Sequence, residues 1–305
     1  MESHKSAEPV CLGIDIGGTN LKLGLVDARG QLLASRSVPT PAEDGAAAVA
    51  AEVGRQARRL LEERGAEDCR GAGLGVPGTV DSERGVVLYS NNLHWDDVPL
   101  VDLLRPYLPM PMEIANDADC AVLGETVAGA GMGRRNVVML TLGTGVGGGV
   151  VVNGELLRGC EPGHVAIVED GERCTCGRRG CLECYASATA LKREAERAAG
   201  RPVEPEETFA AAAAGDPALR AVAQAYIRRL GAGVVNLINL FRPELLLLGG
   251  GVSQQGEALL EPLRAMARQE CFGGEKGVLP EMGIAALGNR AGMIGAASLL
   301  KGILP

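Results

Sequence analysis

Short apolar runs separated by glycine-containing turns open the chain. Three β-prone runs, Val10–Ile16, Leu21–Val26 and Gln31–Val38, predict an antiparallel meander of strands. The apolar positions of Gly45–Arg64 recur at near-helical spacing and predict a long helix, after which the apolar run Ala72–Val76 predicts another strand. The first part of the chain is therefore expected to combine a small sheet with a long helix.

Helical and strand-like patterns alternate along the rest of the chain. The segment Val86–Pro99, which contains the letters NNLHW, is expected to be loop. Further helices are expected over Asp119–Ala128 and Ala186–Ala199, from the N-cap Asp216 to about Asn239, after the candidate N-cap Ser253, and near Arg290–Leu300. Further strands are expected over Val137–Leu142, Val150–Val152, Glu244–Leu248 and Gly283–Leu287. Such alternation predicts an α/β fold with covered sheets.

Two hairpins in this pattern are similar to each other. Ile14–Val26 consists of a strand, a Gly-Gly-Thr turn and a strand, and Val137–Val152 consists of a strand, a Gly-Thr-Gly turn and a strand. We interpret the similarity as the sign of a two-lobed enzyme built from duplicated halves.

Composition and charge exclude several classes of partner. The net charge is −8 and only 3% of the residues are aromatic, so the chain lacks the basic surface and the stacking side chains of nucleic-acid binders. No apolar run reaches the length of about 18 residues that a membrane span needs. The first ten residues, MESHKSAEPV, contain no apolar signal region. We therefore expect a cytoplasmic protein with neither nucleic acid nor membrane as partner.

The two glycine-rich turns are candidates for phosphate binding. Gly143–Gly148 matches G-x-G-x-x-G, but a strand rather than a helix follows it, which argues against a dinucleotide fold. A hairpin tip with exposed backbone N–H groups and a Thr hydroxyl can bind phosphate, and Asp15–Thr19 adds a carboxylate that can hold Mg²⁺ through waters. Each turn alone is also compatible with an ordinary tight hairpin. The pair favours a nucleotide-phosphate site.

Four of the nine cysteines lie within eleven residues. Cys174, Cys176, Cys181 and Cys184 follow His164, which is ten residues upstream of the first of them. This set offers more than the four soft ligands that tetrahedral Zn²⁺ requires. The spacing leaves two ligand sets open, four cysteines or His164 with three cysteines.

The pair Asn116-Asp117 contains a candidate general base. A carboxylate can orient a hydroxyl group and accept its proton when that hydroxyl reacts. The sequence alone also allows Asp117 to be the N-cap of the helix that follows it.

Several short motifs occur in an order that resembles a known family. They are DIGGTN at 15–20, GVPGTVD at 75–81, NLHW at 92–95, ND at 116–117, LGTGVGGG at 142–149, EPGH at 161–164 and CTCGRRGCLE at 174–183. Over about residues 10–300 the set resembles the ROK family of sugar kinases and sugar-responsive repressors, and in particular its bacterial glucokinases.

The resemblance implies an α/β, two-lobed actin/hexokinase-like ATPase fold with duplicated β-sheet cores and flanking helices. A small lobe, residues 1–115 with 290–305, is expected to carry the first phosphate turn and part of the sugar site. A large lobe, residues 116–289, is expected to carry the catalytic Asp, the second phosphate turn, the zinc loop and the adenosine side.

The resemblance also implies roles for individual residues, with Asp117 as the general base. The implied sugar-binding residues are Gly78, Asn92, Asn116, Asp117, Glu161, His164 and Glu183. The implied nucleotide- and phosphate-binding residues are Asp15, Gly17, Gly18, Thr19, Thr144, Gly145, Gly249 and Gly250. The implied ligands of a structural Zn²⁺ are His164, Cys174, Cys176 and Cys181, which leaves Cys184 outside the site.

The activity expected from the resemblance is ATP-dependent phosphorylation of the 6-hydroxyl of glucose, with Mg-ATP in the interlobe cleft of a homodimer. Two departures from the family pattern, Pro162 and the short loop in which Gly159-Cys160 leads directly into Glu161, alter one side of the expected sugar site. N-acetylmannosamine, N-acetylglucosamine or fructose therefore stay open as substrates, and polyphosphate as donor. A non-catalytic sugar sensor or transcriptional regulator is the alternative from another class. Only 14 residues precede Asp15, and we expect these to be too few for a DNA-binding domain.

Overall fold

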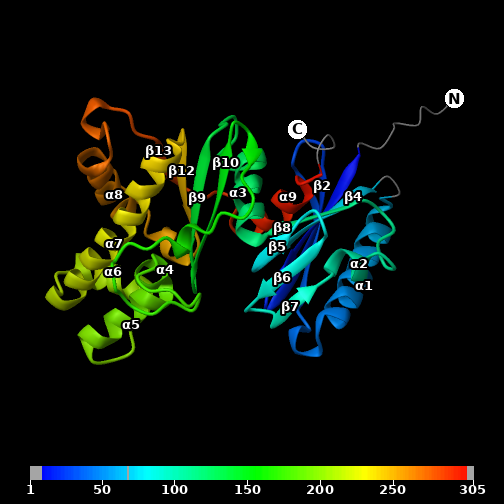
Figure 1. Ribbon diagram of the computed structural model, residues 1–305, viewed down its shortest axis with the longest axis horizontal. Coiled ribbons are helices and arrows are strands. Elements are labelled where there is room, and N and C mark those ends of the chain that lie inside the picture. The colour runs from blue at the N-terminus through cyan, green and yellow to red at the C-terminus, as the bar shows by residue number, and fades with distance from the viewer. Residues whose placement is uncertain (1–8, 67–68, 301–305) are drawn as a thin grey trace. The chain divides into compact units, whose positions relative to one another are not determined.

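The computed structural model describes residues 9–66 and 69–300. Contacts divide the chain into two compact units (Figure 1). The first unit takes in Met1–Gly133, Leu156–Gly159 and Asn289–Pro305, and the second takes in Arg134–Glu155 and Cys160–Gly288. The ends of the predicted small lobe, residues 1–8 and 301–305, lie outside the described residues.

A five-stranded sheet in the order β3-β2-β1-β4-β8 forms the centre of the first unit. The expected meander is confirmed, because β1 pairs antiparallel with β2 and β2 with β3. Parallel strands then extend the sheet on the other side of β1. The bounds are Val10–Ile16 for β1, Asn20–Asp27 for β2, Leu32–Pro39 for β3, Cys69–Val76 for β4 and Met112–Asn116 for β8.

Helices cover both faces of this sheet. The helices α1 (Ala46–Arg64) and α2 (Leu100–Leu104) lie on one face, and α3 (Asp117–Ala128) and α9 (Ala291–Ala297) lie on the other (Figure 1). The helix α9 comes so close to the strands that a Cβ atom on Gly73 would lie 1.7 Å from the carbonyl oxygen of Ala296. Glycine is therefore required where α9 crosses β4.

The segment expected to be loop forms two strands, so that prediction was wrong. β6 (Val86–Ser90) pairs antiparallel with both β5 (Thr79–Asp81) and β7 (Trp95–Val98) in a three-stranded sheet. Val87 and Trp95 are buried in the core of the first unit, 0% and 4% exposed. Strands of four and five residues are too short to show a clear alternation of apolar and polar positions.

The second unit repeats the strand order of the first. Its sheet has the order β11-β10-β9-β12-β13, in which β9 pairs antiparallel with β10 and parallel with β12, as β1 does with β2 and β4. The duplication predicted from the two hairpins is therefore confirmed at the level of topology. The bounds are Val137–Leu142 for β9, Val146–Val152 for β10, Glu155–Leu156 for β11, Leu245–Gly249 for β12 and Glu281–Ile284 for β13.

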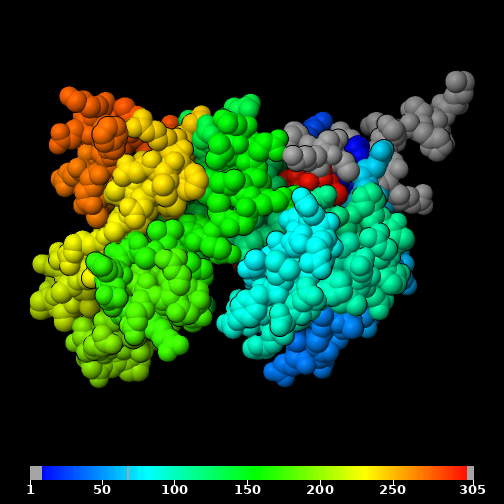
Figure 2. Space-filling view, in the orientation of Figure 1, coloured from blue at the N-terminus to red at the C-terminus, as the bar shows by residue number. Residues whose placement is uncertain are grey.

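On the face seen in Figure 2, the helices that follow the cysteine cluster form much of the outer surface of the second unit. Asp216 caps the longest of them as predicted, since its carboxylate accepts hydrogen bonds from the N–H groups of Ala218 and Leu219. No helix within the described ranges has the length and apolarity to cross a membrane. The bounds are Glu183–Ala186 for α4, Ala188–Ala199 for α5, Pro205–Ala213 for α6, Pro217–Phe241 for α7 and Glu257–Glu270 for α8.

Two details differ from the sequence prediction. Ser253 does not cap α8, because it lies in the 3₁₀ helix Gly251–Gln255 and its hydroxyl donates to the carbonyl of Gly250; Gly256 precedes α8 instead. The helix α3 belongs to the first unit, although the predicted division begins the large lobe at residue 116. The reason is its packing on α9, where a Cβ atom on Gly295 would lie 1.6 Å from the carbonyl oxygen of Cys120.

The contact between β4 and α9 predicts that Gly73→Ala destabilises the protein by about 1–3 kcal/mol, because overpacking forces the helix away from the sheet. The matched control is Gly283→Ala in β13, where the new Cβ atom would meet only Leu247, at 3.7 Å. Urea unfolding of both variants checks this. A Gly73→Ala protein as stable as Gly283→Ala contradicts it.

Candidate functional site

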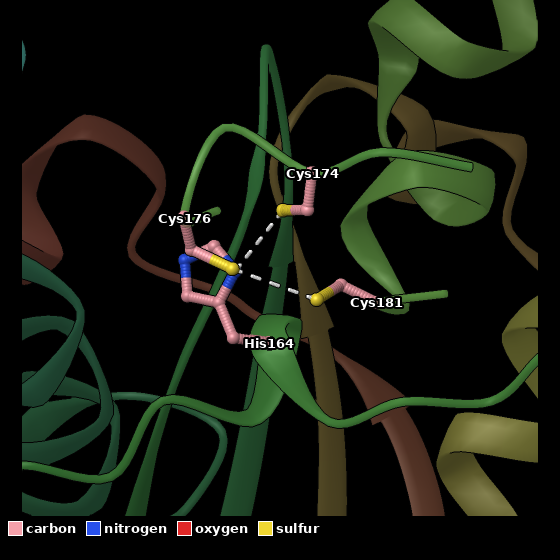
Figure 3. A group of neighbouring side chains, drawn as sticks. All are labelled: His164, Cys174, Cys176 and Cys181. Carbon is pink, nitrogen blue, oxygen red and sulfur yellow. Dashed lines mark hydrogen bonds between the residues drawn. The ribbon is translucent and has the colours of Figure 1, made fainter. Parts of the chain in front are cut away.

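One histidine and three cysteines form a compact group of metal-ligating side chains (Figure 3). The ligand atoms of His164, Cys174, Cys176 and Cys181 lie within 4.8 Å of one another. The Cys174 Sγ atom is 3.5 Å from His164 Nδ1, and the Cys176 Sγ atom is 3.6 Å from Cys181 Sγ. Tetrahedral zinc, with Zn–S bonds of about 2.3 Å, holds two sulfurs about 3.8 Å apart. The donor set therefore fits a tetrahedral zinc ion.

The structure distinguishes Cys184 from this group. Its Sγ atom contacts the carbonyl oxygen of Glu172 at 3.9 Å, and it lies in α4 instead of the loop that carries the other cysteines. Within the described residues, the ligand group with His164 and three cysteines forms, and it does not include Cys184. Burial and the neighbouring thiols raise the pKa of Cys181 to about 12, a shift that a bound cation would oppose.

The EPGH motif lies against β10. Pro162 is the first residue of the 3₁₀ helix Pro162–His164, and a Cβ atom on Gly163 would lie 1.8 Å from the carbonyl oxygen of Val146. Gly148 leaves room for the proline ring, since a Cβ atom there would lie 2.6 Å from Pro162 Cγ. The unusual proline is thus accommodated by a glycine on the neighbouring strand.

Three of the residues assigned to sugar binding come together beside this motif. Burial raises the pKa of the Glu161 carboxyl. The charge of His164 opposes this shift, and the charge of Glu183 adds to it. Glu161 therefore interacts electrostatically with both His164 and Glu183. The three residues supply two carboxylates and an imidazole, which can bind several hydroxyl groups.

The second turn, residues 143–145 between β9 and β10, is held by neighbouring segments. The carbonyl of Gly143 accepts a hydrogen bond from Ala188 N–H at 2.8 Å, and the carbonyl of Thr144 accepts one from the Thr189 hydroxyl at 2.7 Å. Glu183 Oε2 accepts a bond from Val146 N–H at 3.1 Å. The turn is fixed while the side chain of Thr144 stays exposed.

Gly249 and Gly250, at the carboxyl end of β12, lie at the same edge of the sheet as the second turn. Gly250 has a φ of +82°, and a Cβ atom there would lie 2.4 Å from the carbonyl oxygen of Leu142, the last residue of β9. The carboxyl end of β12 therefore lies beside the second turn, so Gly249 and Gly250 are brought together with Thr144 and Gly145.

A charged pair flanks the first turn, residues 17–19 between β1 and β2. The Asp15 carboxylate forms an ion pair with Lys22 across the two strands, with Oδ2 3.2 Å from Nζ. The carbonyl of Gly17 accepts a hydrogen bond from the Thr40 hydroxyl at 2.6 Å. A Cβ atom on Gly18 would lie 3.0 Å from the carbonyl oxygen of Asn92. Asn92 is thus next to the first turn.

Asn116, and not Asp117, is the N-cap of α3. Asn116 Oδ1 accepts a hydrogen bond from Ala118 N–H at 2.8 Å, and its Nδ2 atom donates to the carbonyl of Gly78 at 2.9 Å. Asp117 is the first residue of the helix and its Oδ1 atom accepts from Ala118 N–H at 2.9 Å. The capping alternative for Asp117 was therefore wrong, and Asn116 joins Gly78 to the beginning of α3.

Several residues that hold these groups were not found from the sequence. Lys22 is revealed only by the register of β1 and β2, and Thr189 only by the packing of α5 on the second turn. The short loop is fixed by Arg158, which donates to the carbonyl of Ile114 at 2.8 Å, and by the buried Asp119, which accepts from Gly159 N–H at 3.3 Å. None of these contacts corresponds to a local motif.

The assigned residues thus form one group in each unit. The first unit brings together the Asp15 turn, Asn92, Gly78, Asn116 and Asp117. The second unit brings together the metal group, Glu161, Glu183, the second turn and Gly249-Gly250. Carboxylates, amides and glycine turns in these combinations can bind hydroxyl groups and phosphates.

Comparison with known proteins identifies relatives along most of the chain. The family model described as the ROK family matches residues 11–303. The glucokinase of Halalkalibacterium halodurans is 35% identical over 316 residues, which cover 95% of this chain and 94% of that protein. The crystal structure of a ROK family glucokinase from Streptomyces griseus in complex with glucose and AMPPNP has a TM-score of 0.79 at 35% identity and covers 95% of this chain and 98% of its own.

A regulatory protein is also similar. The xylose repressor of Caldicellulosiruptor bescii is 33% identical over 220 residues, which cover 66% of this chain and 55% of the repressor. Kinases and repressors therefore both occur among the relatives. The glucokinase matches almost the full length of both proteins at 35% identity, and the N-acetylgalactosamine kinase of Shewanella, with 95% of this chain and 96% of that protein covered, does so at 31%.

Proposed function

Since the chain belongs to the ROK family, we propose that it is an ATP-dependent glucokinase, which transfers the γ-phosphoryl group of ATP to the 6-hydroxyl of glucose. The observation that carries this proposal is similarity to glucokinases along almost the full length of both proteins. The retention of Asn116-Asp117 at the start of α3 supports catalysis over sugar sensing alone.

In this proposal Asp117 is the general base. A sugar hydroxyl is a poor nucleophile at neutral pH, and a carboxylate within hydrogen-bond reach orients it and accepts its proton. The two hydrogen bonds of Asn116 fix the backbone from which Asp117 projects. Asn116 is also a sugar ligand in this proposal. Gly78, Asn92, Glu161, His164 and Glu183 complete the proposed sugar site.

The two turns bind the nucleotide phosphates. The second turn offers backbone N–H groups and the exposed Thr144 hydroxyl, with Gly249 and Gly250 on the adenosine side. The first turn offers Gly17, Gly18 and Thr19, and Asp15 holds the magnesium ion of Mg-ATP through water. Magnesium prefers oxygen ligands and retains several waters, which suits a single carboxylate.

His164, Cys174, Cys176 and Cys181 hold a structural zinc ion, which supplies a fixed centre for a loop that has little regular secondary structure. The proposal includes a cytoplasmic homodimer, as the family resemblance implies. N-acetylhexosamine kinase and fructokinase activities are competing outcomes of the first test.

That test measures coupled ADP release with glucose, N-acetylglucosamine, N-acetylmannosamine, mannose and fructose. We expect the highest kcat/KM with glucose and ATP. Preference for another sugar reassigns the substrate within the kinase class. Binding of a sugar without ADP release favours the sensor and contradicts the enzyme.

The second prediction concerns Asp117→Asn. Asparagine keeps the shape of the side chain but cannot accept the proton, so kcat should fall by about 10²–10⁴-fold while the dissociation constant of glucose changes little. The exposed Asp102→Asn in α2 is the matched control. Steady-state kinetics and calorimetric titration measure the two quantities. Near-normal turnover would remove Asp117 from the mechanism.

The third prediction is one zinc ion per chain. Elemental analysis should find it in the purified protein and in Cys184→Ser, since Cys184 is not a member of the ligand group. Cys176→Ser should lose the ion and part of its thermal stability, because a ligand is removed. Zinc loss from Cys184→Ser together with retention in His164→Ala would establish the four-cysteine set instead.

A further inference from the structure

The carboxylate of Glu183 forms hydrogen bonds with two segments that are distant from each other in sequence. Its Oε2 atom accepts a hydrogen bond from Val146 N–H at 3.1 Å, at the end of the second turn. Its Oε1 atom accepts one from the Thr175 hydroxyl at 3.3 Å and lies 3.8 Å from Cys174 Sγ, both within the metal loop, residues 174–181. The two oxygens of one carboxylate therefore connect the second turn with the metal loop.

The second turn has a shape that fits this carboxylate. A Cβ atom on Gly145 would lie 2.3 Å from Glu183 Oε2, so the carboxylate lies directly over a backbone that carries no side chain. Hydrogen bonds from an N–H group to a charged acceptor are among the stronger ones in proteins. Loss of this acceptor leaves the Val146 N–H without the partner that fixes it.

The segment that follows the metal loop in sequence also contacts the second turn. Glu183 is two residues from the ligand Cys181 and begins α4, and α5 follows after Ser187. The first residues of α5 bind the turn, Ala188 through the carbonyl of Gly143 and Thr189 through that of Thr144. Cys181 therefore lies at one end of a nine-residue segment, 181–189. This segment forms three hydrogen bonds with residues 143–146.

The negative charge of Glu183 limits how this residue can assist phosphate binding at the second turn. A carboxylate repels a phosphate group, so Glu183 beside a phosphate-binding turn gives no attraction for the nucleotide. Its contribution is order, since backbone N–H groups bind an anion well only when they are held in the right orientation beforehand.

We propose that Glu183 is a positioning residue that couples the metal loop to the second turn, so that binding of the metal by His164 and the three cysteines fixes the turn that receives the nucleotide phosphates. This role rests on the proposed kinase function and is separate from the contact with the sugar assigned to Glu183 above. The metal loop thereby acts on nucleotide binding as well as on the sugar site.

Hydrogen–deuterium exchange of the full-length, zinc-loaded protein without substrates tests the coupling. Glutamine carries no charge and keeps only one acceptor oxygen, so it cannot accept from both Val146 N–H and the Thr175 hydroxyl. In Glu183→Gln the peptide that contains residues 143–149 should therefore exchange about tenfold faster than in the unmodified protein, a factor of the size expected for one charged hydrogen bond. Removal of zinc with a chelator should give a similar increase in the unmodified protein and little further increase in Glu183→Gln. Unchanged protection of β12 in all samples serves as the internal reference.

Two further variants support the measurement. Glu172→Gln removes a carboxylate of the same region, which pairs with Arg193 at 2.9 Å, and should leave the turn protected. Thr175→Val removes one donor to Glu183 Oε1 and should accelerate exchange at the turn to a smaller extent, which tests the coupling even if Glu183→Gln does not fold.

Calorimetric titration gives the functional result. The dissociation constant of a non-hydrolysable Mg-ATP analogue should rise about tenfold in Glu183→Gln and stay unchanged in Glu172→Gln.

The proposal is overturned if exchange at 143–149 is unaffected by Glu183→Gln, or if chelation accelerates it equally in both proteins. Loss of sugar affinity alone would leave Glu183 as a sugar ligand only. Since exchange is measured without substrates, it distinguishes failure of this coupling from failure of the kinase assignment.

Discussion

Direct contact between backbones, with no side chain between them, is the constraint on which both units depend. In the first unit the chain of α9 lies on Gly13 and Gly73, where a Cβ atom would approach carbonyl oxygens to 1.8 and 1.7 Å. In the second unit Gly163 and Gly250 allow the EPGH motif and the end of β12 to lie on β10 and β9. Such contacts account for part of the high glycine content, 44 of 305 residues, and they place the turns at the edges of the sheets.

Equivalent hairpins occur at the same position of both sheets, but they carry different side chains next to their turns. In the first sheet the residues facing each other across the hairpin are Asp15 and Lys22, and in the second they are Thr141 and Gly147. A carboxylate and an ammonium group therefore flank the first turn, whereas the second hairpin has uncharged residues at these positions and its turn is oriented by Glu183, Ala188 and Thr189 from outside the sheet. Duplication of one scaffold gives two phosphate-binding candidates with distinct electrostatics.

Local patterns predicted those parts of the fold that are determined locally. The meander β1–β3 and the helix α7 could be predicted, since alternation, turns and the Asp216 cap lie within short windows. The metal group could be found because cysteine spacing is visible in the sequence, but its exclusion of Cys184 depends on where α4 begins. The assignment of α3 to the first unit depends on α9, about 170 residues later, and the pairing of Asp15 with Lys22 depends on strand register. Neither leaves a signal in a short window.

The position of α9 has a consequence for how the protein is made. This helix comes last among the described elements, yet it packs on the central strands β1 and β4 of the unit that is translated first. All residues of the second unit lie between residues 134 and 288 and so leave the ribosome before α9 does. Domains commonly fold in the order of their synthesis. Here the first unit instead keeps Gly13 and Gly73 uncovered until α9 has been synthesised, and the second unit can complete its core earlier.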